Sequence, residues 1–558
     1  MTLLLPSVVA LPLISAVLTF FLSARMGRKV SEISVALIAL SFALTTLEFW
    51  SAIRGWEGRA EIVLGGWLTL FRDPLSAILA WVIAGFSLIV HVYSRRYMAD
   101  EPGYARFFIL LNLMTAALLV MVSASNLILL LIAWHFVGVL LYLLLGQDLH
   151  SRPAQRHAFT TFFTYRLGDL PMVLAAALLF HAYGTWSLTE IFARLGDTPQ
   201  TTAFGLPLPV VVGFLIALSA FARSAQFLVH TWLPYTMNGP TPVSALMHAG
   251  IVNAGGVLVN RFAPVYVHAG EILHLMFVVG LFTAIVGSVL MLTQHDIKKS
   301  LGYSTMGQMG FMIMECGVGA FSLAIYHLIA HGMFKGTMFL NAAGVIRSAR
   351  RDDGVPAEDL YTFIVERQVA RRRRPWLAMA IFTLTVPAVI LFLAHYFVEQ
   401  AFMEKQGAVI LLFFGWMTGA QLIFATYHMR AENPLRLFSL ILVSFTIVVI
   451  GYSAIAHTFD LYLYPDEAFR KALYTAAGVK LIYFDVFVAL LAAVIVLGWI
   501  FTYYSERKRL PAPVWSRRLR GMFYATVSRE FFLGDVYART ARAVIGGAGR
   551  INAMLGWR

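Results

Sequence analysis

The sequence predicts an all-α protein that crosses a membrane about 14 to 15 times. Of its 558 residues, 59% are hydrophobic and 13% are charged, and the mean hydropathy is +0.75. A soluble domain carries roughly a quarter charged residues. Apolar runs of about 20 residues, the length that crosses about 30 Å of hydrocarbon, follow one another along most of the chain. These observations exclude a soluble enzyme of several domains.

About fifteen such runs can be counted. They suggest four blocks: N-terminal transmembrane helices at 1–100, a core at 101–400, further transmembrane helices at 401–504 and a basic tail at 505–558. The approximate centres of the runs are Leu13, Ala43, Ile83, Ala116, Leu131, Ala175, Leu215, Val252, Val279, Gly310, Ile329, Thr385, Phe414, Leu442 and Ala492.

The charged residues indicate which way the chain is oriented. The formal net charge is +14, which on a soluble chain would suggest a nucleic-acid binder. Divided between alternate connections, the charges instead sum to +17 on one side and about −4 on the other. Because basic residues collect on the cytoplasmic side, we expect the C-terminus inside and the N-terminus outside. No nucleic-acid partner is expected.

The first run, from Leu3 to Leu22, supports the same orientation. Its basic residues, Arg25, Arg28 and Lys29, follow the run instead of preceding it. This order is the reverse of a secretory signal, so we expect a retained first span without cleavage.

Two segments look different from spans. Residues 350–374 combine apolar residues at near-helical spacing with four consecutive arginines, which suits either a short interfacial helix on anionic lipid or a solvated loop. Residues 512–558 mix aromatic residues with eight arginines and predict an amphipathic cytoplasmic surface helix or a docking site for a partner subunit.

Ionisable residues inside apolar runs commonly mark an ion or proton route. Arg166 and Asp169 are three residues apart in the sixth run, so they share a helix face and can pair. This pair suits either a structural ion pair or a functional site. His135, in the fifth run, His395, in the twelfth, and Glu48, in the second, are single candidates.

The seventh run ends in a break. Arg223, Gln226 and His230 have the spacing of one helix face, and prolines and glycines from Pro234 onward then interrupt the helix. Broken helices at membrane depth occur where protein or water satisfies the backbone, and transporters use them at ion sites. We expect Thr241 to cap the next helix, with His248 less than two turns into it.

The eleventh run carries three aligned ionisable groups. His327, His331 and Lys335 lie at positions i, i+4 and i+8, within about 80° of arc and about 12 Å of helix axis. Histidine and a lysine removed from water can both exchange protons with ordered water at physiological pH. The spacing therefore predicts a proton wire.

No motif of a soluble enzyme competes with this interpretation. The sequence has no Walker loop, no HExxH motif, no paired CxxC and no Rossmann glycine pattern between a strand and a helix. A single cysteine, Cys316, excludes a disulfide framework or a thiolate metal cluster made by this chain alone. We expect no cofactor and no metal in this chain.

Three stretches resemble the antiporter-like proton-conducting subunits of complex I, membrane-bound hydrogenases and Mrp cation antiporters: ARSAQFLVHTWLPYTMNGPTPVSALMHAGIVNAGG, QHDIKKSLGYSTMGQMGFM and YHLIAHGMFKGTMFL. The resemblance runs from about residue 60 to 346. It implies a fourteen-helix core of two inverted five-helix repeats, each with a broken helix, along a central axis of hydrated charged residues. His248, His327, His331 and Lys335 match the central histidines and lysine of the family.

Three positions depart from the family pattern. His135 stands where the family has a glutamate, and Arg223 stands where it has a lysine. The lysine of the twelfth, broken helix has no counterpart beside Pro387, although His395 or Glu399 could substitute. Arginine does not release its proton at ordinary pH, so Arg223 is expected to act as a fixed charge that sets the local field.

Length and these departures favour a shorter branch of the family, the membrane subunits of energy-coupled inorganic-carbon accumulation pumps in the bacterial inner membrane. That resemblance implies a chain that conducts protons, or sodium ions, and makes CO2 hydration to bicarbonate one-way in a cytoplasmic zinc partner resembling a β-carbonic anhydrase. The alternative is a subunit of an Mrp-type antiporter or a complex-I-like oxidoreductase. A membrane scaffold without transport is a third possibility.

Overall fold

The computed structural model describes residues 4–349, with short gaps at 55–59, 64, 66–67, 197–201, 204, 237–238 and 295, and most of 454–478 and 514–556, with a few single positions between. The predicted spans centred on Thr385, Phe414, Leu442 and Ala492 lie outside the described residues, as do residues 350–374, Pro387, His395 and Glu399. The chain forms two compact units. The geometry that follows belongs to the first, which comprises Met1–Leu340, Tyr462–Ala476 and Leu519–Arg558.

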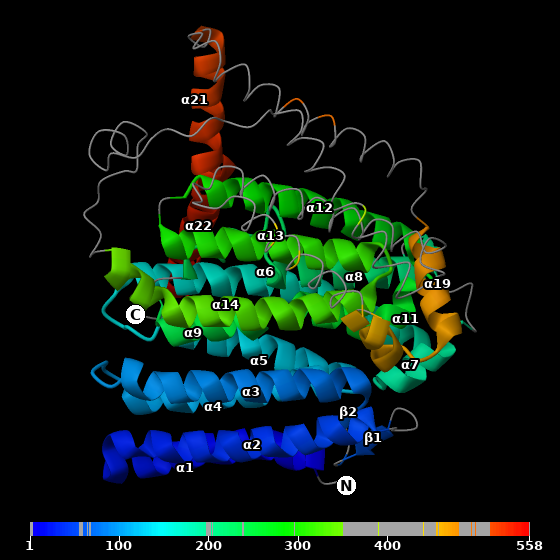
Figure 1. The fold of residues 1–558 in the computed structure, drawn as a ribbon, viewed down its shortest axis with the longest axis horizontal. Coiled ribbons are helices and arrows are strands. Elements are labelled where there is room, and N and C mark those ends of the chain that lie inside the picture. Colours follow the sequence, from blue (N-terminus) through cyan, green and yellow to red (C-terminus); the bar gives the residue numbers. More distant parts are fainter. Residues whose placement is uncertain are drawn as a thin grey trace. The chain divides into compact units, whose positions relative to one another are not determined.

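The N-terminal part consists of four long helices that pack against one another, seen in blue in Figure 1, with a short hairpin between the second and third. Asp73 begins the third helix because its carboxylate accepts the Ser76 amide at 2.8 Å, while the Ser76 hydroxyl accepts the Asp73 amide. The elements are α1 (Leu4–Met26), η1 (Gly27–Lys29), α2 (Val30–Ile53), β1 (Ala60–Val63) antiparallel to β2 (Thr69–Arg72), α3 (Pro74–Tyr97) and α4 (Tyr104–Ser123).

The next part leads to the break. Asn126, Ser151 and Ser187 each begin a helix by accepting an amide hydrogen bond with the side chain. The elements are α5 (Leu127–Leu145), α6 (Arg152–Tyr183), α7 (Leu188–Arg194), the two-residue strands β3 (Thr202–Ala203) and β4 (Leu206–Pro207), and α8 (Leu208–Arg223). The hairpins were not expected from the sequence, but they are too short to alter the all-α class.

The break occupies residues 224–240, and it begins earlier than expected. Helix α8 ends at Arg223, so Gln226 and His230 do not continue its face, which corrects that expectation. The chain turns because Ala225 and Leu228 have left-handed backbone conformations, with φ of 47° and 77°. The Gln226 side chain then donates to the Ser224 carbonyl oxygen at 3.0 Å.

After the break the chain resumes in short helical pieces: α9 (Thr241–Leu246), the π-helical turn η3 (Met247–Ile251), α10 (Ala254–Arg261) and α11 (Ala263–Tyr266). Thr241 does not cap α9, which corrects a second expectation. Proline at 240 occupies the cap position without a side-chain bond. The Thr241 hydroxyl instead lies 3.0 Å from the Tyr97 hydroxyl, so it ties α9 to the end of α3.

Helices α12 (Gly270–Leu292) and α13 (Ile297–Gly317) pack along their lengths in a close pair, seen in green in Figure 1. The predicted run centred on Gly310 is therefore a helix. A Cβ at Gly310 would lie 2.5 Å from the Ala284 nitrogen, and one at Gly280 would lie 2.5 Å from the Met314 nitrogen. The absence of side chains at these positions allows the close approach. Helix α14 (Phe321–Ala349) follows.

The described C-terminal part is also helical. It comprises α19 (Glu467–Ala477), α21 (Val514–Ser528), the single turn η5 (Glu530–Phe532) and α22 (Leu533–Met554). Exposed apolar residues and arginines alternate on α22, including Val536, Arg539 and Val544. The predicted helical character of the tail is confirmed.

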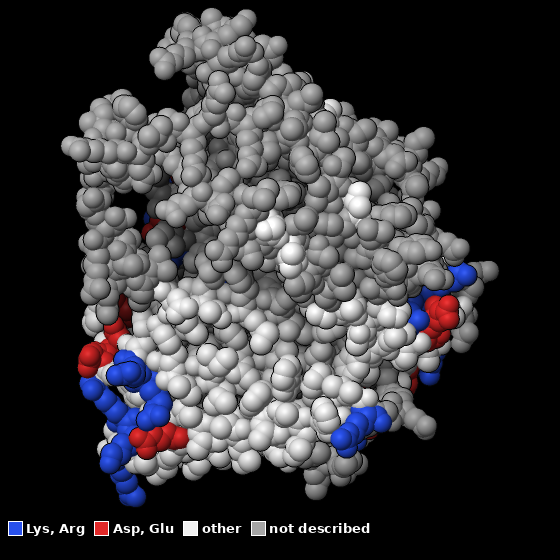
Figure 2. Space-filling model, viewed as in Figure 1, with Lys and Arg blue, Asp and Glu red and all other residues white. Residues whose placement is uncertain are grey.

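Seven helical segments among the described residues are long and apolar enough to cross a membrane. One of them, Leu5–Ile53, is 49 residues long and contains both α1 and α2. On the face shown in Figure 2, the charged side chains of the described residues gather at two ends, with uncharged surface between them. This arrangement is the one expected of a protein that spans a bilayer.

Candidate functional site

A cluster of ionisable side chains joins α5, α6 and α8. Asp169 forms an ion pair with Arg166 at 3.0 Å and with Arg223 at 3.2 Å. His135 Nδ1 lies 3.1 Å from the same carboxylate. The structure thus brings together the pair predicted from the sequence, the single candidate His135, and Arg223 from the predicted face at the end of the seventh run. A single carboxylate, that of Asp169, links them.

Arg223 is the buried centre of this cluster. Its side chain is fully buried, and it donates to the Trp134 carbonyl oxygen as well as to Asp169. The guanidinium carbon lies 4.4 Å from the centre of the Trp134 ring and 4.1 Å from that of Tyr165. Aromatic faces of this kind stabilise a desolvated cation. Arg223 is therefore held as a charge in a buried pocket between two aromatic rings.

Gly138 makes the cluster possible. A Cβ at this position would lie 2.4 Å from Arg166 Nη2 and 3.1 Å from the Tyr165 ring. Any larger residue would push the Arg166 guanidinium away from Asp169.

The negative charge of this cluster comes from Asp169 on α6, and His135 lies beside it on α5. Arg166 adds a second cation, so two guanidinium groups share one carboxylate. The two arginines and Asp169 together carry a net positive charge, which sets the local electric field.

A second cluster lies along α13 and α14. His327 Nδ1 lies 3.0 Å from Glu315 Oε1, and His327 Nε2 lies 2.8 Å from Gln308 Oε1. Both ring nitrogens face oxygen atoms, which suits a doubly protonated ring beside a carboxylate. If the Gln308 amide rotates, Nε2 can accept a hydrogen bond and the ring can be neutral. His327 therefore has partners for gaining and for losing a proton.

His331 and Lys335 continue this row. The His331 ring lies 6.3 Å from the His327 ring, and neither of its nitrogens has a hydrogen-bond partner among the described residues. Lys335 is 2% exposed and donates to the Leu301 carbonyl oxygen at 3.3 Å. Within the described residues no carboxylate pairs with Lys335. The predicted alignment on one helix is confirmed, with buried nitrogen atoms open to further partners.

His248 lies beside this row. It is in the π-helical turn after the break, and its ring stacks on Phe339 of α14 at 4.3 Å. It interacts electrostatically with Lys335 and with His331. The broken helix therefore contributes a histidine to the α14 row.

His230 lies in the break itself. It is fully buried, its ring stacks on Phe227 at 5.7 Å, and both ring nitrogens lack partners in the described part of the chain. No direct contact joins it to either cluster in that part of the chain.

Glu315 and Gln308 are residues that sequence reasoning missed. Glu315 lies inside α13, with 6% of its surface exposed. The signal was available, because Gln308 and Glu315 are seven residues apart and so fall on the same helix face.

Two further buried polar groups were also missed. Arg261 forms an ion pair with Asp73 and donates to the Val122 carbonyl oxygen at 2.7 Å. His91 of α3 is fully buried, and its Nε2 lies 3.2 Å from Oδ1 of Asn112 on α4. Glu48, a single candidate from the sequence, pairs with Arg72 at 3.0 Å.

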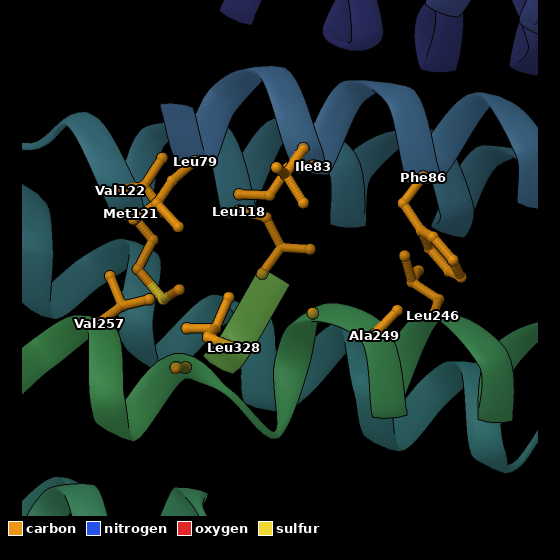
Figure 3. Close-up of a pocket in the computed structure, with 13 residues that line it drawn as sticks. Leu79, Ile83, Phe86, Leu118, Met121, Val122, Leu246, Ala249, Val257 and Leu328 are labelled. Carbon is orange, nitrogen blue, oxygen red and sulfur yellow. The ribbon is translucent and has the colours of Figure 1, made fainter. Parts of the chain in front are cut away.

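An apolar cavity of about 30 Å³ lies between α3 and α4 on one side and α10 and α14 on the other (Figure 3). Leu79, Phe86 and Leu328 are among its lining residues, which are all apolar. A cavity of this kind stays dry, so it carries no ion route. No group of three or more metal-ligating side chains occurs among the described residues.

Comparison with known proteins gives the family. Residues 124–421 match the family described as NADH:quinone oxidoreductase/Mrp antiporter, TM. Residues 68–108 match the N-terminus of complex I chain 5.

Two solved structures share the fold. They are a chain of the Mrp complex from Dietzia sp. DQ12-45-1b (TM-score 0.57, 24% identity, covering 99% of this chain and 62% of that one) and a chain of the archaeal membrane-bound sulfane sulfur reductase (TM-score 0.58, 18% identity, covering 85% and 97%).

Among curated relatives, the chain is 36% identical to NAD(P)H-quinone oxidoreductase chain 5 of Picosynechococcus sp. over 56% of its length and 48% of the relative's length. It is 55% identical, over 98% of both chains, to the probable inorganic carbon transporter subunit DabB1 of Halothiobacillus neapolitanus. The resemblance inferred from the motifs is therefore confirmed. The chain belongs to the antiporter-like membrane subunits of the NADH:quinone oxidoreductase/Mrp family, and within that family it resembles DabB.

Proposed function

We propose that this chain is the proton-conducting subunit that energises a two-protein complex for inorganic-carbon accumulation. Its family supports an ion-conducting role, and the printed name of its 55% identical relative supports inorganic carbon as the cargo of the complex. The single observation that carries the proposal is the row of Glu315, His327, His331 and Lys335, in which His327 is partly buried and the other three are buried.

Protons pass along this row by exchange between neighbouring groups. Glu315 and Gln308 hold His327 at one end, and Lys335 lies against the start of α13 at the other end. The distance of about 12 Å from His327 to Lys335 along α14 is too long for direct transfer, so ordered water and His331 bridge it. His248 serves the same row from the broken helix.

The Asp169 cluster has a different role in this proposal. Arg223 keeps its proton, so it does not relay protons. Together with Arg166 and Asp169 it fixes the field in the first half of the core, which biases the neighbouring histidines. His135 and His230 are proposed to belong to this half of the route, and His395 and Glu399 to the second broken helix.

Downhill proton flow makes carbon accumulation one-way. CO2 hydration yields bicarbonate and a proton, and it is reversible without an energy source. One charge moving through 100 mV releases about 2.3 kcal/mol, which corresponds to about a fifty-fold displacement of an equilibrium. Coupling one inward proton to each hydration would hold bicarbonate well above its equilibrium level.

The hydration chemistry is assigned to a partner. We propose a cytoplasmic, DabA-like subunit that resembles a β-carbonic anhydrase and holds the zinc. The chain is placed in the bacterial inner membrane with its N-terminus outside and the basic tail in the cytoplasm, because the basic residues favour that orientation. Membrane lipid and this subunit are the expected partners.

Copurification tests the partner. The tagged chain, expressed from its native locus and solubilised in mild detergent, should elute with one soluble zinc protein. An Mrp-type antiporter or complex-I-like role predicts several small membrane subunits instead, and that result would overturn the proposal. Flux measured with sodium or with protons as the only permeant cation identifies the ion.

Growth tests the role of the row. In a strain that needs elevated CO2, the wild-type complex should restore growth in air, and Lys335→Ala should not, although the complex still assembles. Lys471→Ala changes an exposed lysine on α19 and should restore growth fully. If Lys335→Ala restored growth in air, the α14 row would not conduct protons, and the chain would be better explained as a membrane scaffold without transport.

A further inference from the structure

The C-terminal tail packs onto the break between α8 and α9. Tyr537 of α22 donates to the Leu228 carbonyl oxygen at 2.8 Å, and the Phe531 ring meets the Phe227 ring at 6.0 Å. Phe227 is the residue on which His230 stacks. The tail is therefore part of the environment of the broken helix.

One acidic residue of the tail is buried in this contact. Glu530 is 3% exposed, and its Oε1 accepts the Tyr235 hydroxyl at 2.9 Å. Its Oε2 has no hydrogen-bond partner among the described residues. A buried carboxylate oxygen without a partner is costly, so its position needs an explanation.

The backbone around Glu530 is strained. Glu530, Phe531 and Phe532 have φ values of 57°, 54° and 60°, so three successive residues other than glycine are left-handed. This conformation is rare for residues with a Cβ and costs free energy. This turn separates α21 from α22 and coincides with the buried Glu530 side chain.

The surroundings of Glu530 are mainly basic and aromatic. The ring of Tyr235 lies under Lys299 Nζ at 4.7 Å and stacks on His157 at 5.1 Å. Arg156 and Asp535 also interact electrostatically with Tyr235. Asp535, the other acidic residue that interacts with Tyr235, is exposed.

Glu530 and Lys335 both lie against the start of α13. Lys335 donates to the carbonyl oxygen of Leu301, and the Tyr303 side chain, two residues further on, interacts electrostatically with Glu530. The Tyr303 hydroxyl is buried. Leu301 and Tyr303 are two residues apart, so the contacts of Lys335 and Glu530 with α13 lie within one turn of this helix.

We propose that Glu530 is a proton-binding residue that the tail contributes to the conducting core, at the end of the row nearest Lys335. It exchanges a proton with Lys335 through Tyr303 and ordered water, and it releases that proton toward the end of α6 and α13 that carries Arg156 and Lys299. This inference rests on the proposed proton conduction.

Proton flux into vesicles that contain the whole complex tests it. Glu530→Gln keeps the size and hydrogen-bonding capacity of the side chain but not its charge, and it should lower the flux at least tenfold. Glu530→Asp keeps the acid and should retain more flux than Glu530→Gln. The exposed Asp535→Asn removes the same charge from the same segment and should stay within twofold of wild type.

A spectroscopic measurement separates proton binding from a structural role. In pH-difference infrared spectra of the complex, wild type should show a carboxyl band that is lost in Glu530→Gln and shifted in Tyr235→Phe. Unchanged flux and an unchanged band in a correctly assembled Glu530→Gln complex would overturn the inference. If the wild-type and Lys335→Ala complexes conduct protons equally, the proposed function itself fails. A failure of the Glu530 inference alone leaves the loss of flux in Lys335→Ala intact, so the two results can be distinguished.

Discussion

At the scale of single residues, one carboxylate, that of Asp169, holds together the cluster of His135, Arg166 and Arg223. Two buried or half-buried guanidinium groups meet this carboxylate, and Arg223 is fully buried. A buried charge that loses its partner typically costs about 3–5 kcal/mol. Asp169 therefore determines whether Arg223 can stay where it is.

Asp169→Asn should lower the apparent melting temperature of the purified complex strongly, because it leaves Arg223 buried without a counterion. Arg166→Gln keeps the Asp169–Arg223 pair and should cost much less. Thermal unfolding followed by gel filtration measures both. Equal losses in the two variants would show that Asp169 does not hold Arg223 in the way described.

Glu315 is the second residue with a sharp prediction. Glu315→Gln keeps an acceptor oxygen for His327 but removes the negative charge that faces the ring. Proton flux should fall, while assembly stays intact, because positioned acid–base groups contribute about 10²–10⁴-fold to proton transfer. Glu467→Gln, an exposed change on α19, is the matched control. Full flux in Glu315→Gln would make Glu315 a packing residue.

At the scale of elements, α12 and α13 depend on glycines at their contact. Gly310→Ala places a methyl group 2.5 Å from the Ala284 nitrogen, so the helix backbones must separate. Overpacking of this kind costs about 1–3 kcal/mol. The stability of the complex should fall measurably in a thermal shift assay.

Gly546→Ala is the control for that change. It lies within α22, and an added Cβ there would meet no atom within 4 Å. Replacing a helical glycine by alanine at an open position stabilises a helix by up to about 1 kcal/mol. A loss of stability in Gly546→Ala as large as that in Gly310→Ala would contradict the close packing of α12 and α13.

Periodicity predicted the elements of the described core well. Length and apolarity located the helices, and the α14 row followed directly from the i, i+4, i+8 spacing of His327, His331 and Lys335. The end of α8 was not predictable in the same way, because Gln226 and His230 fit the helical spacing. Ala225 and Leu228 adopt left-handed conformations for tertiary reasons that no local pattern reveals.

Contacts between helices were the part of the candidate site that the sequence could not predict. The sequence gives no distance between α5, α6 and α8, so His135 could not be joined to Asp169 and Arg223 before the fold was known. Likewise, Asp73 and Arg261 form a buried pair although they are 188 residues apart in sequence. Glu530 belongs to the tail that the sequence predicts as a surface helix or docking site, and its contact with Tyr235 is also a tertiary one.

At the scale of the whole molecule, the net charge of +14 is a property of topology. Most of the excess lies in the C-terminal tail and in the connections predicted to be cytoplasmic. The structure gives part of this tail a second role, since Glu530 and Tyr537 contact the broken helix. A partner that binds the exposed arginines of α22 would therefore bind next to the conducting core.

The most direct test of the account is proton flux into vesicles that contain the complex and a pH-sensitive dye. With an inside-negative potential, the wild-type complex should acidify the lumen, and Lys335→Ala should slow acidification at least about tenfold. Lys471→Ala should match wild type. Acidification by Lys335→Ala at the wild-type rate would contradict a proton route along α14.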